Sequence, residues 1–186
     1  DLAGEFGRAG KSNPAPADSA GMWNRGFVPL GTDGAGGRLN SVDGFGGTFT
    51  GLGNTISNLV VDTGDKNFAG LFGYSSGTIS DIGLIGGSVK GGGSVGGLVG
   101  YLSEGSITRA YATGTVQSAA SAGGLVGFQL DGTITQAYAT GTVQGDDSVG
   151  GLVGYQNGGD IKQAYATGAV TSRGPRVGGL VGWQTS

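Results

Sequence analysis

The sequence contains no cysteine and no histidine, only four prolines, and only 12% charged residues. Without cysteine the chain has no disulfide and no thiolate metal site. Without histidine it lacks the paired ligands of a zinc peptidase and the usual base of a serine nucleophile. We therefore expect no metal, no cofactor and no catalysis by these routes.

Charge and hydropathy argue against two further kinds of partner. The formal net charge is −3, and no run of lysine or arginine offers a surface for phosphates or an anionic membrane. No apolar stretch reaches the roughly 18 residues that a membrane-spanning helix needs. We expect neither nucleic-acid binding nor membrane insertion.

Glycine is the residue in excess, at 45 of 186 positions, and it recurs periodically. A motif of the form GGLVG followed by an aromatic residue occurs five times, with its second glycine at Gly70, Gly97, Gly124, Gly151 and Gly179. The spacings are 27, 27, 27 and 28 residues. A repeat of about 20 to 50 residues is typical of solenoids and propellers. Glycine also interrupts every window with helical spacing, so long helices are not expected.

Further columns of residues follow the same period. Each motif is followed by an isoleucine, an Ala-Tyr-Ala-Thr-Gly segment and a valine, namely Ile107, Ile134 and Ile161, then Val116, Val143 and Val170. The isoleucine column is expected to extend upstream to Ile79 and Ile56. Three short apolar runs separated by glycine-containing turns predict three strands per coil, with successive coils stacked about 4.8 Å apart.

Variation between the repeats predicts which side chains face the core. The alanines of the Ala-Tyr-Ala segments never change, and strand alternation then turns Tyr111, Tyr138 and Tyr165 outward or toward a corner. Leu98 and Val99 are adjacent apolar residues. They require either a bend or coverage on both sides, and periodicity alone does not choose between the two.

These patterns predict an all-β fold, a single-stranded parallel β-helix of about six coils with about 27 residues per coil, which we expect to be right-handed. Residues 1–46 are expected to form an irregular N-terminal cap or entry region, and residues 47–186 the β-helix, as a fragment of a larger chain. An open last coil exposes unpaired backbone groups. Either further repeats or head-to-tail self-association through the solenoid ends is expected there.

The GGLVGY, GGLVGF and GGLVGW copies, with the AYATGTV segments, resemble the GLUG repeat of large bacterial surface proteins. The upstream segments GMWNRGFVPLG and GGTFTGLGNTISNLVV resemble the region that precedes such repeats in filamentous-haemagglutinin-like adhesins and in the noncatalytic part of IgA-specific metallopeptidases. The resemblance implies an extracellular, right-handed parallel β-helix at the bacterial cell surface. Its expected role is that of a shaft, display surface or self-assembling fibre in adhesion, with a host-surface or glycan ligand.

Two repeated columns are candidate ligand faces. A row of threonines could bind ice, although threonine is also simply favoured in strands; its members are Thr113, Thr115, Thr140, Thr142 and Thr167. An aromatic column could stack against sugars, although internal stacking between coils explains such a column equally well; its members are Tyr74, Tyr101, Phe128, Tyr155 and Trp183.

Acidic residues offer two weaker candidates. Parallel β-helices also host polysaccharide-active enzymes that use clustered acids, and Glu104, Asp131 and Asp160 fall at nearly equivalent places in three repeats. Solvated turn residues are the alternative explanation. The segment from Asp62 to Asn67 resembles the start of a calcium loop but lacks the distal glutamate, so a plain turn is the other prediction.

Overall fold

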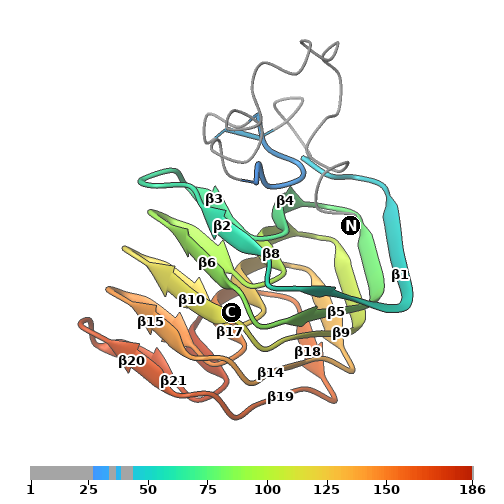
Figure 1. The fold of residues 1–186 in the computed structure, drawn as a ribbon. Helices are drawn as coiled ribbons and strands as arrows, with labels where there is room; N and C mark the ends of the chain where they lie inside the picture. Colours follow the sequence, from blue (N-terminus) through green and yellow to red (C-terminus); the bar gives the residue numbers. More distant parts are fainter. Residues whose placement is uncertain (1–26, 34–36, 39–43, 186) are drawn as a thin grey trace, which may run out of the picture.

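In the computed structural model the chain winds repeatedly through four parallel sheets, so that each coil contributes one rung to every sheet (Figure 1). The structure describes residues 27–33, 37–38 and 44–185. These residues form about five coils of roughly 27 residues. The prediction of an all-β parallel solenoid with this period is confirmed.

Two of the sheets carry the predicted isoleucine and valine columns. The isoleucine sheet stacks, in order, β1 (Thr48–Ser57), β5 (Thr78–Ile85), β9 (Ser106–Ala112), β13 (Thr133–Thr135) and β18 (Asp160–Lys162), and its last two rungs continue as β14 (Tyr138–Ala139) and β19 (Tyr165–Ala166). The valine sheet stacks β2 (Val60–Asp62), β6 (Ser88–Gly91), β10 (Thr115–Ser118), β15 (Val143–Gly145) and β20 (Val170–Ser172).

The other two sheets flank the GGLVG motif. The glycine sheet, whose strands from β7 onward end on the first glycine of that motif, stacks β3 (Phe68–Ala69), β7 (Ser94–Gly96), β11 (Ser121–Gly123), β16 (Ser148–Gly150) and β21 (Arg176–Gly178). The aromatic sheet stacks β4 (Phe72–Ser75), β8 (Val99–Ser103), β12 (Val126–Leu130), β17 (Val153–Asn157) and β22 (Val181–Thr185).

The register places like residues above one another. Ile134 lies opposite both Ile107 and Ile161, and Val143 lies opposite both Val116 and Val170. The column prediction fails at its upstream end, where Phe49 rather than Ile56 lies opposite Ile79. A register shift between Thr50 and Asn54 in β1 moves Ile56 opposite Leu84 instead.

Two other predictions from the sequence are wrong. Each sheet has five stacked rungs, not six, because the described residues before Thr48 form only isolated bridges and no further coil. Each coil has four strands instead of three, because the GGLVG motif is not one strand. It bends at Gly97 and Leu98 and divides the run between β7 and β8.

This bend brings the glycine and aromatic sheets so close together that only glycine fits. A Cβ atom on Gly96 would lie 2.7 Å from both the Gly127 nitrogen and the Leu125 oxygen, and one on Gly127 would lie 2.7 Å from the Gly100 oxygen. Real Cβ atoms essentially never approach another atom within 3.0 Å. The glycines of the motif are therefore required by the contact between the two sheets.

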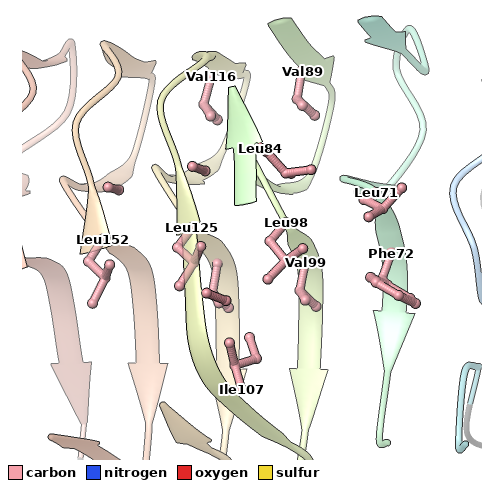
Figure 2. Close-up of a cluster of buried hydrophobic side chains, with 14 of the residues drawn as sticks. Leu71, Phe72, Leu84, Val89, Leu98, Val99, Ile107, Val116, Leu125 and Leu152 are labelled. Carbon is pink, nitrogen blue, oxygen red and sulfur yellow. The ribbon is translucent and has the colours of Figure 1, made fainter. Parts of the chain in front are cut away.

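The leucine of the motif fills the core at this bend. Leu98, Leu125 and Leu152 are fully buried and lie one above another (Figure 2). The Leu98 N–H donates to the Leu125 carbonyl at 3.0 Å, and the Leu125 N–H donates to the Leu152 carbonyl at 2.9 Å. Of the two arrangements considered for Leu98 and Val99, the structure shows the bend.

The alternation predicted for the Ala-Tyr-Ala segments is confirmed. Ala110, Ala112, Ala137 and Ala139 keep at most 2% of their surface exposed, whereas the tyrosines between them lie on the outer face of the isoleucine sheet. The core is thus built from small alanines on one wall and larger aliphatic residues on the others. Figure 2 shows Val89 and Val116 projecting into it beside Leu84 and Leu98.

The N-terminal end of the aromatic sheet is covered by the described residues that precede β1. The Leu30 N–H donates to the Leu71 carbonyl at 2.9 Å, and the Phe45 N–H donates to the Tyr74 carbonyl at 3.0 Å. The Phe45 ring packs against the Phe72 ring at 4.9 Å between centroids. The cap predicted for residues 1–46 lies largely outside the described residues, and its boundary stays a prediction.

Candidate functional site

The predicted threonine row follows a corner of the solenoid. Thr113, Thr140 and Thr167 lie between the isoleucine and valine sheets, whereas Thr115 begins β10 and Thr142 directly precedes β15. The Thr113 hydroxyl accepts a hydrogen bond from the Gly86 N–H at 2.9 Å. The Thr-x-Thr units therefore bend around this corner instead of lying along one flat strand. Ligand binding by this row stays a prediction.

A second set of hydroxyl side chains lies on the outer face of the isoleucine sheet, in two parallel columns that we call the hydroxyl columns. These residues flank Phe49 and the buried isoleucines, so strand alternation turns them outward. Pairing places them in register on four successive rungs: Thr48, Thr78, Ser106 and Thr133 in one column, and Thr50, Ser80, Thr108 and Thr135 in the other.

The hydroxyl columns are partly exposed and have few partners of their own. The Ser106 hydroxyl donates to the Thr78 hydroxyl at 3.3 Å. On the fifth rung the columns end in a charged pair, because the Lys162 ammonium contacts the Asp160 carboxylate at 2.9 Å. The short sequences TIS, SIT and TIT carried a signal for these columns, but the longer AYATGTV repeat drew the prediction to the neighbouring corner.

The predicted aromatic column forms a ladder on the aromatic sheet. Centroids of consecutive rings lie between 4.5 and 4.9 Å apart, and all but one pair are nearly parallel. The exception is Phe128 with Tyr155, whose planes meet at 77°. Burial raises the pKa of Tyr101. This is the internal stacking that was the alternative explanation for the column.

Arginines lie against the rings at both ends of this ladder. The Arg38 guanidinium carbon lies 4.4 Å from the Tyr74 ring centroid, and the Arg176 guanidinium carbon lies 3.3 Å from the Trp183 ring centroid. Arg176 also reaches the Asp147 carboxylate at 3.2 Å. Much of each ring face is thus already occupied by a neighbouring ring or a cation, which leaves mainly ring edges for a ligand.

A second ladder, which was not predicted, runs along the outer face of the isoleucine sheet. The Tyr111 and Tyr138 rings lie 4.7 Å apart, and the Tyr138 and Tyr165 rings lie 5.1 Å apart, with interplanar angles of 2° and 5°. The Tyr111 ring lies over Gly83, where a Cβ atom would collide with it. Burial, and then the neighbouring tyrosines, raise the pKa of Tyr138.

An ion pair between consecutive coils lies beside this tyrosine ladder. The Arg109 Nε donates to Asp81 Oδ1 at 2.6 Å, and the Arg109 Nη2 donates to Asp81 Oδ2 at 2.8 Å. These hydrogen bonds from the guanidinium hold the pKa of Asp81 below its ordinary value. Both residues have positive φ, as do Gln136 and Gln163 on the following coils, so the backbone repeats the same local bend even where the side chain changes.

Three adjacent segments, residues 91–117, 118–144 and 145–171, match the GLUG motif. Residues 91–171 are GLUG motif repeats. The resemblance seen in the GGLVG copies is thereby confirmed for this part of the chain. No curated protein and no solved structure matches the chain.

The acidic column suggested by the sequence does not form. In the GLUG coils Asp160 pairs with Thr133, whereas the residue one repeat after Asp131 is Gly158. Glu104 and Asp131 are exposed and have positive φ, which is typical of turn residues. Among the described residues, no group of three or more acidic side chains is placed to hold a metal ion.

The calcium-like segment upstream of the GLUG repeats is a turn. The Gly64 N–H donates to the Asp62 Oδ1 at 2.9 Å, which is the local hydrogen bond of an Asx turn. The Asp62 carboxylate also lies 3.8 Å from the Lys90 ammonium on the next coil. No helix in the described part of the chain is long and apolar enough to cross a membrane.

Proposed function

We propose that the chain is a non-catalytic structural module of a secreted bacterial surface adhesin, in which the solenoid serves as a shaft or display surface. The observation that carries this proposal is the unbroken register of the four sheets over five rungs, together with the GLUG repeats. A rod of this kind separates whatever is attached to its two ends and presents its outer faces in a fixed orientation. Its host-surface or glycan ligand is part of the same proposal.

The location and the lack of catalysis are tested separately. Antibodies raised against the purified chain should label intact cells of the parent bacterium, and labelling only after lysis would contradict a surface role. The chain should release no reducing ends from a panel of plant, animal and bacterial polysaccharides. Release that is abolished by the Asp131→Asn variant would favour the alternative of a polysaccharide-active enzyme.

The hydroxyl columns favour ice binding as a second candidate function. Stacked rungs lie about 4.8 Å apart and alternate residues along a strand about 6.7 Å apart, so the two columns form a regular lattice of hydroxyl and methyl groups. Such a lattice can order water in an ice-like arrangement. This proposal replaces the corner threonines of the sequence prediction by the outer face of the isoleucine sheet.

Ice binding is measured directly by thermal hysteresis and by the shape of growing ice crystals. We expect the chain to shape ice, and the Thr108→Lys and Thr135→Lys variants to lose this activity because a long charged side chain interrupts the lattice. The matched controls are Gln117→Lys and Gln144→Lys on the outer face of the valine sheet, where both residues are exposed. Equal loss in both pairs, or no ice shaping at all, would contradict this candidate.

A further inference from the structure

The C-terminal end of the solenoid exposes residues whose equivalents are buried one coil earlier. Val149 and Leu152 have no exposed surface, whereas Val177 and Leu180, at the same places in the last coil, are 50% and 37% exposed. Tyr165, the last ring of the tyrosine ladder, is 52% exposed. The last coil therefore presents the same apolar surface that every inner coil uses to bind its successor.

The backbone at this end continues the same pattern. The leucine N–H of each GLUG motif donates to the leucine carbonyl of the next coil: Leu98 to Leu125, Leu125 to Leu152, and Leu152 to Leu180, at 2.9 to 3.0 Å. No described residue lies beyond Leu180 to continue this series. The edge strands β18, β20, β21 and β22 likewise pair on one side only.

Gly179 provides an independent argument that something occupies the space beyond the last coil. A Cβ atom on Gly124 or Gly151 would collide with the carbonyl oxygen of the following coil, at Gly151 and Gly179 respectively. A Cβ atom on Gly179 would meet nothing within 4 Å, and no positive φ demands glycine there. Glycine therefore stands at a position where the described residues give no steric reason for it, and a following coil would supply that reason.

The opposite end of the solenoid does not complement this surface. The carbonyl and N–H groups on the free edge of β4 are engaged by Leu30 and Phe45, and the Phe45 ring covers Phe72. A second copy stacking head to tail would first have to displace these residues. The predicted head-to-tail fibre thus requires an opened N-terminal end.

We propose that the C-terminal end is an acceptor for one further GLUG-type coil, paired parallel to the last coil and supplied by a polypeptide other than the capped end of a second copy. The partner is defined by its chemistry. It carries glycines where Gly179 and the aromatic sheet approach it, a leucine above Leu180, and an aromatic ring above Trp183. Binding continues the coil-to-coil interface that already repeats along the chain.

The probe for this proposal is a synthetic peptide with the sequence of residues 131–157, which is one complete coil of the solenoid. The receiving protein is the full chain carrying Trp23→Phe, so that Trp183 is its only tryptophan. We expect saturable one-to-one binding, seen as a blue shift of Trp183 emission and a gain of β-sheet circular dichroism. A peptide with Leu152→Asp serves as the control probe and should not bind.

The receiving end is tested by the Gly179→Ala variant. The added methyl group has open space in the free chain but would collide with the carbonyl of an incoming coil, so binding should be lost while the thermal midpoint of unfolding stays unchanged. The matched control is Gly47→Ala at the N-terminal end, where a Cβ atom makes only ordinary contacts, at 3.5 Å from Phe45. This control should bind the peptide normally.

Three results would overturn the proposal. The first is no binding of the peptide by the unmodified chain, and the second is binding that Gly179→Ala leaves intact. The third is a dimer or filament of the chain alone in light scattering that Gly179→Ala abolishes, because the occupant would then be a second copy. None of these outcomes depends on where the protein is located in the cell.

Discussion

Leu152 and Leu180 occupy the same position in consecutive copies of one motif, yet the first is fully buried and the second keeps 37% of its surface exposed. The same contrast separates Val149 from Val177. Burial in this protein is therefore a property of the stack and not of the repeat, because each coil is covered only when the next one lies on it. The inner coils and the last coil form a natural experiment in which local sequence is held nearly constant.

The largest effect is expected from an alanine placed at the second glycine of the motif. Gly124→Ala should destabilise the chain by more than about 3 kcal/mol, because the added Cβ atom collides with the Gly151 carbonyl and lies 2.7 Å from the Ala139 Cβ. Gly179→Ala should change stability by no more than about 0.5 kcal/mol. Chemical denaturation measured by circular dichroism compares the two variants. Equal losses would show that the glycines are needed for reasons within their own coil.

A smaller effect follows from truncating the leucine at the bend. Leu125→Ala should cost about 2 to 5 kcal/mol, the usual range for a buried leucine. Leu180→Ala should cost less than half as much, because part of its surface is already in water. The same denaturation experiment measures both values. If Leu180→Ala proved as costly as Leu125→Ala, the last coil would be covered in solution.

The tyrosine ladder gives a third comparison, with a difference of about 0.5 to 1.5 kcal/mol. Tyr138→Ala removes two stacked pairs, with Tyr111 and with Tyr165, whereas Tyr165→Ala removes only the pair with Tyr138. The free energy of unfolding should therefore fall further in Tyr138→Ala. Tyr138→Phe is the control, since it keeps the rings stacked and should lie close to the unmodified chain.

The smallest effect concerns the ion pair on the outer face. The pKa of Asp81 is below its ordinary value of 3.8, so its ionised form is favoured in the folded chain. Any stability that this adds is present above that value and is lost as the pH falls through the lower pKa of the folded state. Arg109→Gln should raise the pKa of Asp81 toward its ordinary value, as measured by carboxyl NMR titration.

Arg109→Lys separates the two contributions to this shift. Lysine retains the charge but cannot make the two parallel hydrogen bonds of the guanidinium, so the pKa of Asp81 should lie between those of the unmodified chain and Arg109→Gln. An unchanged pKa in both variants would mean that Arg109 does not pair with Asp81 in solution.

The parts of the fold that follow from repetition could be predicted from the sequence. Ile107 and Ile134, or Val116 and Val143, are separated by one period and must meet if coils stack, so their columns were found without a structure. The extension to Ile56 failed because the register shift within β1 breaks that period. The number of strands per coil also failed, because GGLVG looks like a single strand unless the contact between its two sheets is known.

The candidate faces divide in the same way. The aromatic column was found because its members recur at a fixed place, but its geometry, with rings stacked on rings, depends on the direction of the coil axis. The hydroxyl columns were missed because Thr78, Ser80, Ser106 and Thr108 vary between threonine and serine and belong to no long repeated phrase. Their common face becomes visible only when the strands are paired.

The sequence by itself determined the period, the parallel stacking of like residues and the identity of the GLUG repeats, because these depend only on spacing along the chain. The tertiary structure decided where each coil bends, which hydroxyl groups share a face, and that one end is covered while the other remains open. These features arise from contacts between sheets and between coils. A single repeat has no information about them, because its neighbours supply the atoms that make each position tight or exposed.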